Sequence, residues 1–108
     1  MLVLRIVSER PEYPLQITIN GRTLSRVVID QHYRLKHSES INDKIILDLV
    51  KTLDGRKFPL EKQDGDFEYF TVEPVFSLEK PYRVVLLLCL SDNFLGVVNA
   101  YRVDEVIV

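Results

Sequence analysis

The chain has 108 residues, of which 46% are hydrophobic and 28% charged, and its formal net charge at pH 7 is −2. This length and composition fit one folded domain over residues 1–108 and exclude a generally disordered chain. The slight excess of acid argues against a protein that coats nucleic acid. The longest apolar run, Val84–Leu90, is far shorter than the roughly 20 residues that span a bilayer, so we expect no membrane contact.

The N-terminal part predicts a strand and then a β-hairpin. Leu2–Val7 is apolar and predicts the strand, but it lacks the length and cleavage site of a secretory signal, so we expect a cytoplasmic protein. Apolar residues alternate with polar ones from Leu15 to Ile19 and are followed by Asn20-Gly21, the dipeptide typical of a type I′ turn. Arg22–Ile29 is then expected to return as the second strand of the hairpin.

Two helices are expected next. Asp30 can cap a short helical turn that runs through His37. Ser40 is the candidate N-cap of a longer helix over 41–53, because apolar residues recur there with the helical period on one face. Asp43 resembles the acid of a capping box, and Gly55 suits the left-handed position after a helix end.

The C-terminal half predicts a polar loop over 56–66 and then three strands. The strands are expected over 67–72, over 82–90 and over 95–102, and residues 106–108 are expected to add an edge segment or pack at the sheet end. The nearly continuous apolar run in 82–90 indicates a central strand buried on both faces. Together the elements predict an α+β fold with an N-terminal strand, a hairpin, a short helix, an amphipathic helix and a three-stranded antiparallel meander, the helices packing on one sheet face.

The densest group of polar side chains lies between Asp30 and Ser40. Within it, Arg34 and Lys36 supply cations, and His37 supplies an imidazole that can exchange a proton near neutral pH. The alternative interpretation is a solvated face of a short helix that carries no chemistry.

Metal and cofactor sites are not indicated by the sequence. The chain has no glycine-rich phosphate loop and no HExxH motif, so we expect no cofactor. His32 and His37 are five residues apart and would point in different directions from a helix, which argues against a shared metal. The lone Cys89 excludes an internal disulfide and lies in an apolar run, where a thiol is usually inert packing.

A pair of arginines in the last two strands suggests an anion site. A two-residue turn at Asp92-Asn93 would place Arg83 directly opposite Arg102 and Val84 opposite Tyr101. Two like charges in this position repel each other, so a bound phosphate between them would be stabilising. If the two guanidinium groups instead splay into solvent or pair with carboxylates, they form no site.

The order of these elements resembles the small toxin nucleases of the RelE, ParE and BrnT type. The resemblance covers residues 30–102 and is carried by Lys36-His37 ahead of an amphipathic helix and by a late strand that ends in Asn99-Ala-Tyr-Arg102. It implies helices on an antiparallel sheet and a metal-independent ribonuclease. The acidic net charge and the added N-terminal hairpin depart from these toxins, and they fit an inactive relative kept as a binding module.

The resemblance also implies roles for individual residues. His37 would take the proton of the ribose 2′-hydroxyl, with Lys36 assisting. Arg83 and Arg102 would stabilise charge on the phosphorane. Tyr101 would stack on a base or take part in proton transfer.

Three functions remain open at this point. The first is a small binding or regulatory domain without catalytic activity, which acts with a protein partner or as a homodimer. The second is a toxin-like ribonuclease acting on RNA, with His37, Lys36 and Tyr101 as catalytic residues. The third is another anion-binding or small-molecule activity. The expected anion-binding residues are Arg83, Arg102 and Arg34.

Overall fold

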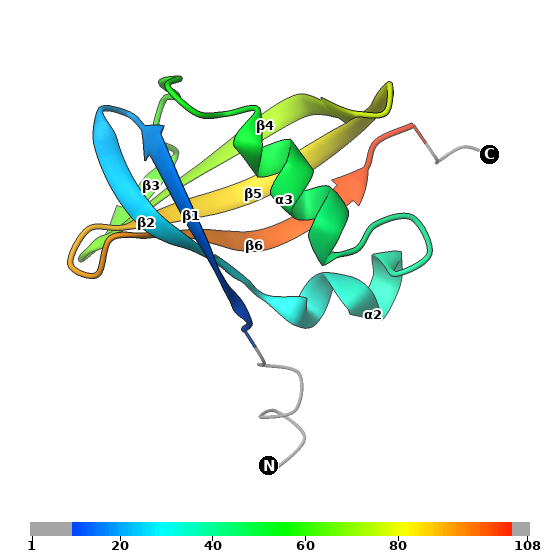
Figure 1. Cartoon of the computed structure of the whole chain (residues 1–108), viewed down its shortest axis with the longest axis horizontal. Helices are drawn as coiled ribbons and strands as arrows, with labels where there is room; N and C mark the ends of the chain where they lie inside the picture. Colours follow the sequence, from blue (N-terminus) through cyan, green and yellow to red (C-terminus); the bar gives the residue numbers. More distant parts are fainter. Residues whose placement is uncertain (1–9, 105–108) are drawn as a thin grey trace, which may run out of the picture.

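The computed structural model describes residues 10–104, which form six strands and two short helices. The strands are β1 Glu12–Ile19, β2 Arg22–Ile29, β3 Lys62–Asp64, β4 Phe67–Ser77, β5 Lys80–Cys89 and β6 Phe94–Arg102. Between β2 and β3 lie the 3-10 turn η1 Gln31–Tyr33 and the helices α2 Arg34–His37 and α3 Asp43–Lys51 (Figure 1). The expected strand over 2–7 and segment over 106–108 lie outside the described residues.

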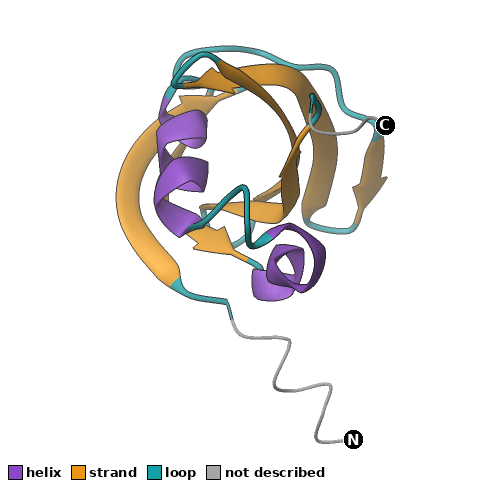
Figure 2. Cartoon of the chain, turned by 90° about the vertical axis from the view of Figure 1, so that its right-hand side faces the viewer, coloured by secondary structure: helices purple, strands orange, loops and turns teal. Residues whose placement is uncertain are grey.

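All six strands belong to one mixed sheet with the order β1-β2-β6-β5-β4-β3. β2 and β6 run parallel, and the other neighbouring strands run antiparallel. Figure 2 shows that the sheet curls and that α3 lies within the curl.

The predicted α+β fold, with helices packed on one sheet face, is therefore wrong. The described part of the protein is mostly β, with 53% of residues 10–104 in strands and 17% helical. The physical reason is that α2 and α3 have only four and nine residues, too few for a helical layer, while strand pairing draws the hairpin, the meander and β3 into one sheet.

The N-terminal hairpin is confirmed. Asn20 and Gly21 both have positive φ, 55° and 76°, as a type I′ turn requires. The register shifts between Pro14 and Ile17, so β1 carries a bulge near its start. This bulge leaves Ile17 and Ile19 pointing into the core.

The longer helix is confirmed, but it begins with a different cap. The Asn42 side chain accepts a hydrogen bond from the backbone N–H of Ile45 at 2.9 Å, so Asn42 rather than Ser40 is the N-cap. Asp43 is consequently the first helical residue and not the acid of a capping box. Its carboxylate instead accepts hydrogen bonds from other elements, described below.

The short helical segment also starts and ends as expected. Asp30 accepts a hydrogen bond from the backbone N–H of His32 at 2.9 Å, and the helical residues end at His37. Gly55 takes the expected left-handed conformation with φ of 83°, three residues beyond the C-cap Thr52 of α3.

Two strand boundaries differ from the prediction in the C-terminal half. β3 forms within the expected loop over 56–66, where it pairs with β4. β4 continues to Ser77 instead of ending at Val72, because the register shift between Val72 and Val75 places Pro74 in a bulge. Proline is tolerated there because a bulge removes the need for a ladder N–H.

The expected central position of β5 is confirmed, because it lies between β6 and β4. Its residues alternate between a buried set that includes Val84 and Leu86 and a half-buried set that includes Val85 and Leu87. Only the face toward α3 is therefore fully buried, so the expected burial of this strand on both faces is wrong. We call the face opposite α3 the outer face.

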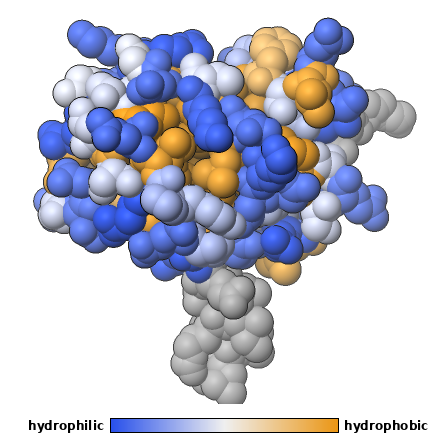
Figure 3. Space-filling model, viewed as in Figure 1, coloured by the Kyte–Doolittle hydropathy of each residue, from blue (hydrophilic) through white to orange (hydrophobic). Residues whose placement is uncertain are grey.

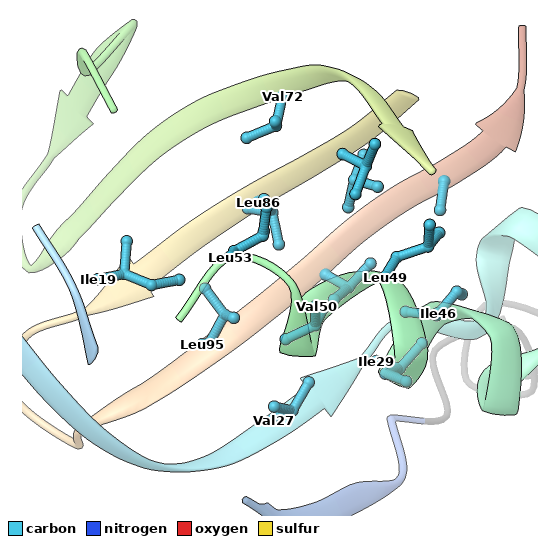
Figure 4. Packing of buried hydrophobic residues seen from close by; sticks show 14 of the residues in the cluster. Ile19, Val27, Ile29, Ile46, Leu49, Val50, Leu53, Val72, Leu86 and Leu95 are labelled. Carbon is cyan, nitrogen blue, oxygen red and sulfur yellow. The ribbon is translucent and has the colours of Figure 1, made fainter. Parts of the chain in front are cut away.

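The core lies between α3 and the inner face of the sheet. Figure 4 shows Ile46, Leu49 and Val50 of α3 among the side chains of β2, β5 and β6. On the side of the molecule that carries α3, hydrophobic side chains are visible in the middle and are surrounded by hydrophilic ones (Figure 3). The partly buried Leu15 and Leu47 pack against this core from β1 and α3.

Leu49→Ala should lower the free energy of unfolding by about 2–5 kcal/mol, because Leu49 is fully buried and its loss leaves a cavity. Leu35 of α2 is 66% exposed, so Leu35→Ala should change the stability by less than about 0.5 kcal/mol. Urea denaturation of both variants checks this. Equal effects of the two substitutions would show that α3 does not contribute its apolar face to the core.

Candidate functional site

The pairing of β5 with β6 decides which side chains share the outer face. Arg83 lies opposite Tyr101, and Tyr82 lies opposite Arg102. The expected pairing of Arg83 with Arg102 is wrong, because four residues separate Cys89 from Phe94 at the turn and the register shifts again between Val85 and Leu86. Paired residues share a face, so Arg83 and Arg102 lie on opposite faces of the sheet.

Four side chains form a row across the outer face at one end of the sheet, and we call them the polar cluster. They come from β4, β5, β6 and α2: Glu73, Arg83, Tyr101 and His37. The Arg83 Nη1 donates to Glu73 Oε1 at 2.9 Å. Arg83 lies opposite Tyr101, and the rings of Tyr101 and His37 are stacked with centroids 5.0 Å apart and planes 20° apart. The row therefore places an imidazole, a phenol, a guanidinium and a carboxylate next to one another.

Arg83 has the most constrained environment in the polar cluster. Its side chain is 40% exposed, yet its Nε is buried and has no hydrogen-bond partner. The hydrogen bond to Glu73 raises the pKa of Arg83 above its usual value, and the neighbouring Tyr101 adds to this effect. Because Glu73 engages only Nη1 in the described structure, other N–H groups of the guanidinium can still meet an anion.

Three of the residues expected at a site lie outside the polar cluster or have other partners. Arg102 is on the inner-facing side of β6 and its Nη2 lies 2.8 Å from Asp104 Oδ1. Arg34 donates through Nε to Gln31 Oε1 at 2.6 Å and lies over the Tyr33 ring at 5.8 Å.

Lys36 directly precedes His37 in α2 and is exposed. Lys36 therefore adjoins a residue of the polar cluster in sequence. The catalytic trio named from the sequence is therefore brought together in part, as His37 and Tyr101 are in ring contact and Lys36 adds only a neighbouring charge.

A second group of polar side chains holds the helical segment that carries His37. Asp43 at the start of α3 accepts hydrogen bonds at 2.6 Å from the phenols of Tyr13 in β1 and Tyr33 in η1. The Gln31 amide donates to the same carboxylate at 3.1 and 3.2 Å. We call these four residues the Asp43 junction, which joins β1, η1 and α3 at one carboxylate.

The charge of Asp43 matters to its partners. Burial acts to raise the pKa of Asp43, but the hydrogen bonds from Tyr13, Tyr33 and Gln31 and the charge of Arg34 outweigh it, and the pKa is lowered overall. Burial and the hydrogen bond to Asp43 raise the pKa of Tyr33. The ionised carboxylate and the neutral phenols thus stabilise each other.

Neither a metal-binding group nor a membrane-spanning helix is found in the part of the chain that the structure describes. Residues 10–104 hold no group of three His, Cys, Asp or Glu side chains placed to bind a metal ion. No helix within them is long and apolar enough to cross a membrane. Cys89 is buried, and its sulfur lies 3.7 Å from the hydroxyl of Ser91.

Two residues of these clusters were missed by the sequence analysis. Glu73 lies just beyond the strand expected over 67–72, so nothing in the sequence indicates its pairing with Arg83. Asp43 is expected only at the start of a helix, and nothing in the sequence indicates that Tyr13 and Tyr33 meet there.

Comparisons with protein-family models, with curated proteins and with solved structures found no match for this chain.

Asp43→Asn should destabilise the protein at pH 7 by about 1–3 kcal/mol, because the junction loses a charged acceptor. The pKa of Asp43 is lower in the folded state, so its contribution is present above the unfolded value of about 3.9 and is lost as the pH falls through the folded value. The stability difference between the two proteins should therefore shrink below about pH 4.

Urea denaturation between pH 3 and pH 7 measures this difference. The matched control is Asp48→Asn, which removes an exposed carboxylate that forms an ion pair with Lys44 on the same helix, and it should cost less than about 0.5 kcal/mol. A pH-independent effect of Asp43→Asn would contradict the role given to its charge.

Proposed function

We propose that this protein is a metal-independent ribonuclease whose reaction takes place at the polar cluster. The observation that carries the proposal is the row of Glu73, Arg83, Tyr101 and His37 on the outer face. It combines groups that transfer protons with a cation that can stabilise a phosphorane. The proposal adopts the role that the resemblance implies for His37, but it uses one arginine where the sequence suggested two.

The proposed reaction is an internal transesterification of RNA. His37 takes the proton of the ribose 2′-hydroxyl, and the 2′-oxygen forms a bond to phosphorus. Arg83 stabilises the negative charge that builds on the non-bridging oxygens. The bond from phosphorus to the 5′-oxygen breaks, Tyr101 supplies a proton to the leaving oxygen, and the products are a 2′,3′-cyclic phosphate and a 5′-hydroxyl. His37 later returns its proton to Tyr101 through solvent.

The order of residues in the row supports this assignment. His37 and Tyr101 are in ring contact, so the group that takes a proton and the group that gives one lie side by side. Tyr101 lies across the β5–β6 ladder from Arg83, which puts the guanidinium within reach of the same phosphate. The Asp43 junction supports the site by fixing η1, from which α2 and His37 continue.

Cleavage of a fluorescein-labelled single-stranded RNA in the presence of EDTA tests the proposal. The wild-type protein should cleave it and should leave the 2′-deoxy analogue intact. His37→Ala and Arg83→Ala should each lower kcat by about 100-fold or more. Matched controls are His32→Ala, which removes an exposed imidazole from η1, and Arg22→Ala, which removes an exposed guanidinium from the start of β2.

Wild-type activity in all four variants would overturn the proposal, as would a wild-type protein that does not cleave any RNA. A requirement for a divalent cation would contradict the metal-independent mechanism. Circular dichroism of each variant establishes that a loss of activity does not come from unfolding.

The second candidate function is a binding or regulatory domain without catalysis, acting with a protein partner or a second copy. It is favoured by the ion pair between Arg83 and Glu73, which already satisfies part of the guanidinium, and by the net charge of −2. A homodimer or a complex with a protein partner that is lost in Arg83→Ala, together with no cleavage of RNA by the wild-type protein, would support this function. In either case we propose that the protein acts in the cytoplasm.

A further inference from the structure

The outer face also contains an apolar depression of about 330 Å³. Its walls include the aromatic rings of Phe67, Tyr69 and Phe94, and its floor includes Leu87 and Gly96. Phe67 is 37% exposed, so at least one ring is open to an approaching molecule.

The missing side chain of Gly96 explains why the face is hollow here. A Cβ built on Gly96 would lie 2.9 Å from Leu87 Cδ1 and 3.0 Å from Leu87 Cγ. Leu87 therefore lies down over the glycine, in space that any other residue at position 96 would fill. The leucine side chain forms a flat apolar floor between the aromatic walls.

The depression and the polar cluster lie on the same strands and the same face. Leu87 and Arg83 are both outward residues of β5, four residues apart, which is about 13 Å along a strand. Tyr69 and Glu73 are separated in the same way on β4. A chain molecule lying along these strands would therefore meet the rings at one end and Arg83 at the other.

Cations lie over two of the aromatic rings. The Arg26 guanidinium is 5.1 Å from the centre of the Phe94 ring, and the Lys62 ammonium is 5.7 Å from the centre of the Tyr69 ring. Aromatic rings combined with cations are the means by which proteins bind single-stranded nucleic acid, because every base has a face that can stack. Arg26 also pairs with Glu12 and Asp92, so stacking rather than net charge dominates at this end.

We propose that the depression holds an unpaired nucleobase of the RNA whose phosphate reacts at the polar cluster. This inference rests on the proposed function and adds the substrate class, a single-stranded RNA several nucleotides long. A distance of about 13 Å corresponds to about four nucleotides of a stacked strand at about 3.4 Å each, and to fewer of an extended one. A dinucleotide would then reach the polar cluster without filling the depression.

Binding is measured by fluorescence polarisation of a labelled single-stranded RNA decamer at several salt concentrations. Phe67→Ala should weaken the affinity by about 5- to 100-fold, the usual cost of losing one stacked base. The matched control is Phe76→Ala, which removes a 56% exposed ring from the other end of β4 and should leave the affinity unchanged. An abasic nucleotide that removes the stacked base should cost as much as Phe67→Ala and add nothing to it.

Salt dependence separates the two ends of the site. Arg83→Ala should reduce the slope of log K against log salt by about 0.7, the value for one phosphate contact to a single strand. Phe67→Ala should leave that slope unchanged, because stacking releases no counterions. The inference is overturned if Phe67→Ala and Phe76→Ala bind RNA equally, or if Phe67→Ala lowers the slope as Arg83→Ala does.

The same variants separate failure of this inference from failure of the proposed function. If the decamer binds through Phe67 but is never cleaved, the inference stands and the catalytic function fails. If the decamer is cleaved, and Phe67→Ala cleaves and binds it as well as the wild-type protein does, the inference fails and the catalytic function stands. Two further results would overturn the inference. One is that a variant lacking residues 1–9 binds RNA more tightly than the full chain and no longer loses affinity on Phe67→Ala. The other is that Phe67→Ala loses a dimer without any change in RNA binding.

Discussion

The parallel pairing of β2 with β6 is the contact on which the rest of this structure depends. It joins Arg26–Ile29 of the hairpin to Phe94–Val97 of the meander, and so makes one sheet from two separate units. The pairing continues for one more residue, because the backbone N–H of Asp30 donates to the carbonyl of Val97 at 3.0 Å. The helical segment that ends at His37 therefore starts beside β6, the strand that carries Tyr101. The chain from this starting point at Asp30 to His37 is short, which keeps the imidazole near the phenol. The juxtaposition of an imidazole and a phenol on the outer face follows from how the two halves of the chain are paired.

The inner and outer faces of the sheet are stabilised by different forces. The inner face is filled by apolar side chains, including those of α3, and contributes most of the stability through burial. The outer face is instead held by local contacts, such as the ion pair of Arg83 with Glu73 and the stack of Tyr101 on His37 of α2. A site built in this way can change its side chains at little cost to folding, because few of them support the core. The exception is the Asp43 junction, where one carboxylate serves both the fold and the position of His37.

The parts of the fold that could be predicted from the sequence are those set by local chemistry. Asn20-Gly21 demands a particular turn, and the apolar residues of 41–53 can share a face only in a helix. The strand Lys62–Asp64 could not be predicted, because its three exposed residues have no strand pattern and become a strand only by pairing with β4. The fold class failed for the same reason, since it is decided by which strands pair and not by what any one segment prefers.

The candidate site could be predicted by residue type but not by arrangement. His37, Tyr101 and Arg83 stood out because their side chains can transfer protons or bind phosphate. Their geometry depends on the register between β5 and β6, which an unexpected turn length and one extra residue in β6 both alter. A shift of one residue reverses the face of every side chain that follows. This is why Arg102 was expected beside Arg83 and Tyr101 was found there.

The extra residue in β6 also decides how the length of this strand can vary. It lies between Val97, which pairs with Leu86, and Asn99, which pairs with Val85. A chain that lacked Val98 would keep both pairings, so Ala100 would still face the core and Tyr101 would still face outward. One residue more or fewer between Asn99 and Tyr101 would instead turn the phenol toward the core and a small side chain toward His37. Natural variation in length is therefore expected to be tolerated at one point of the strand and to be eliminated by selection only two residues further along.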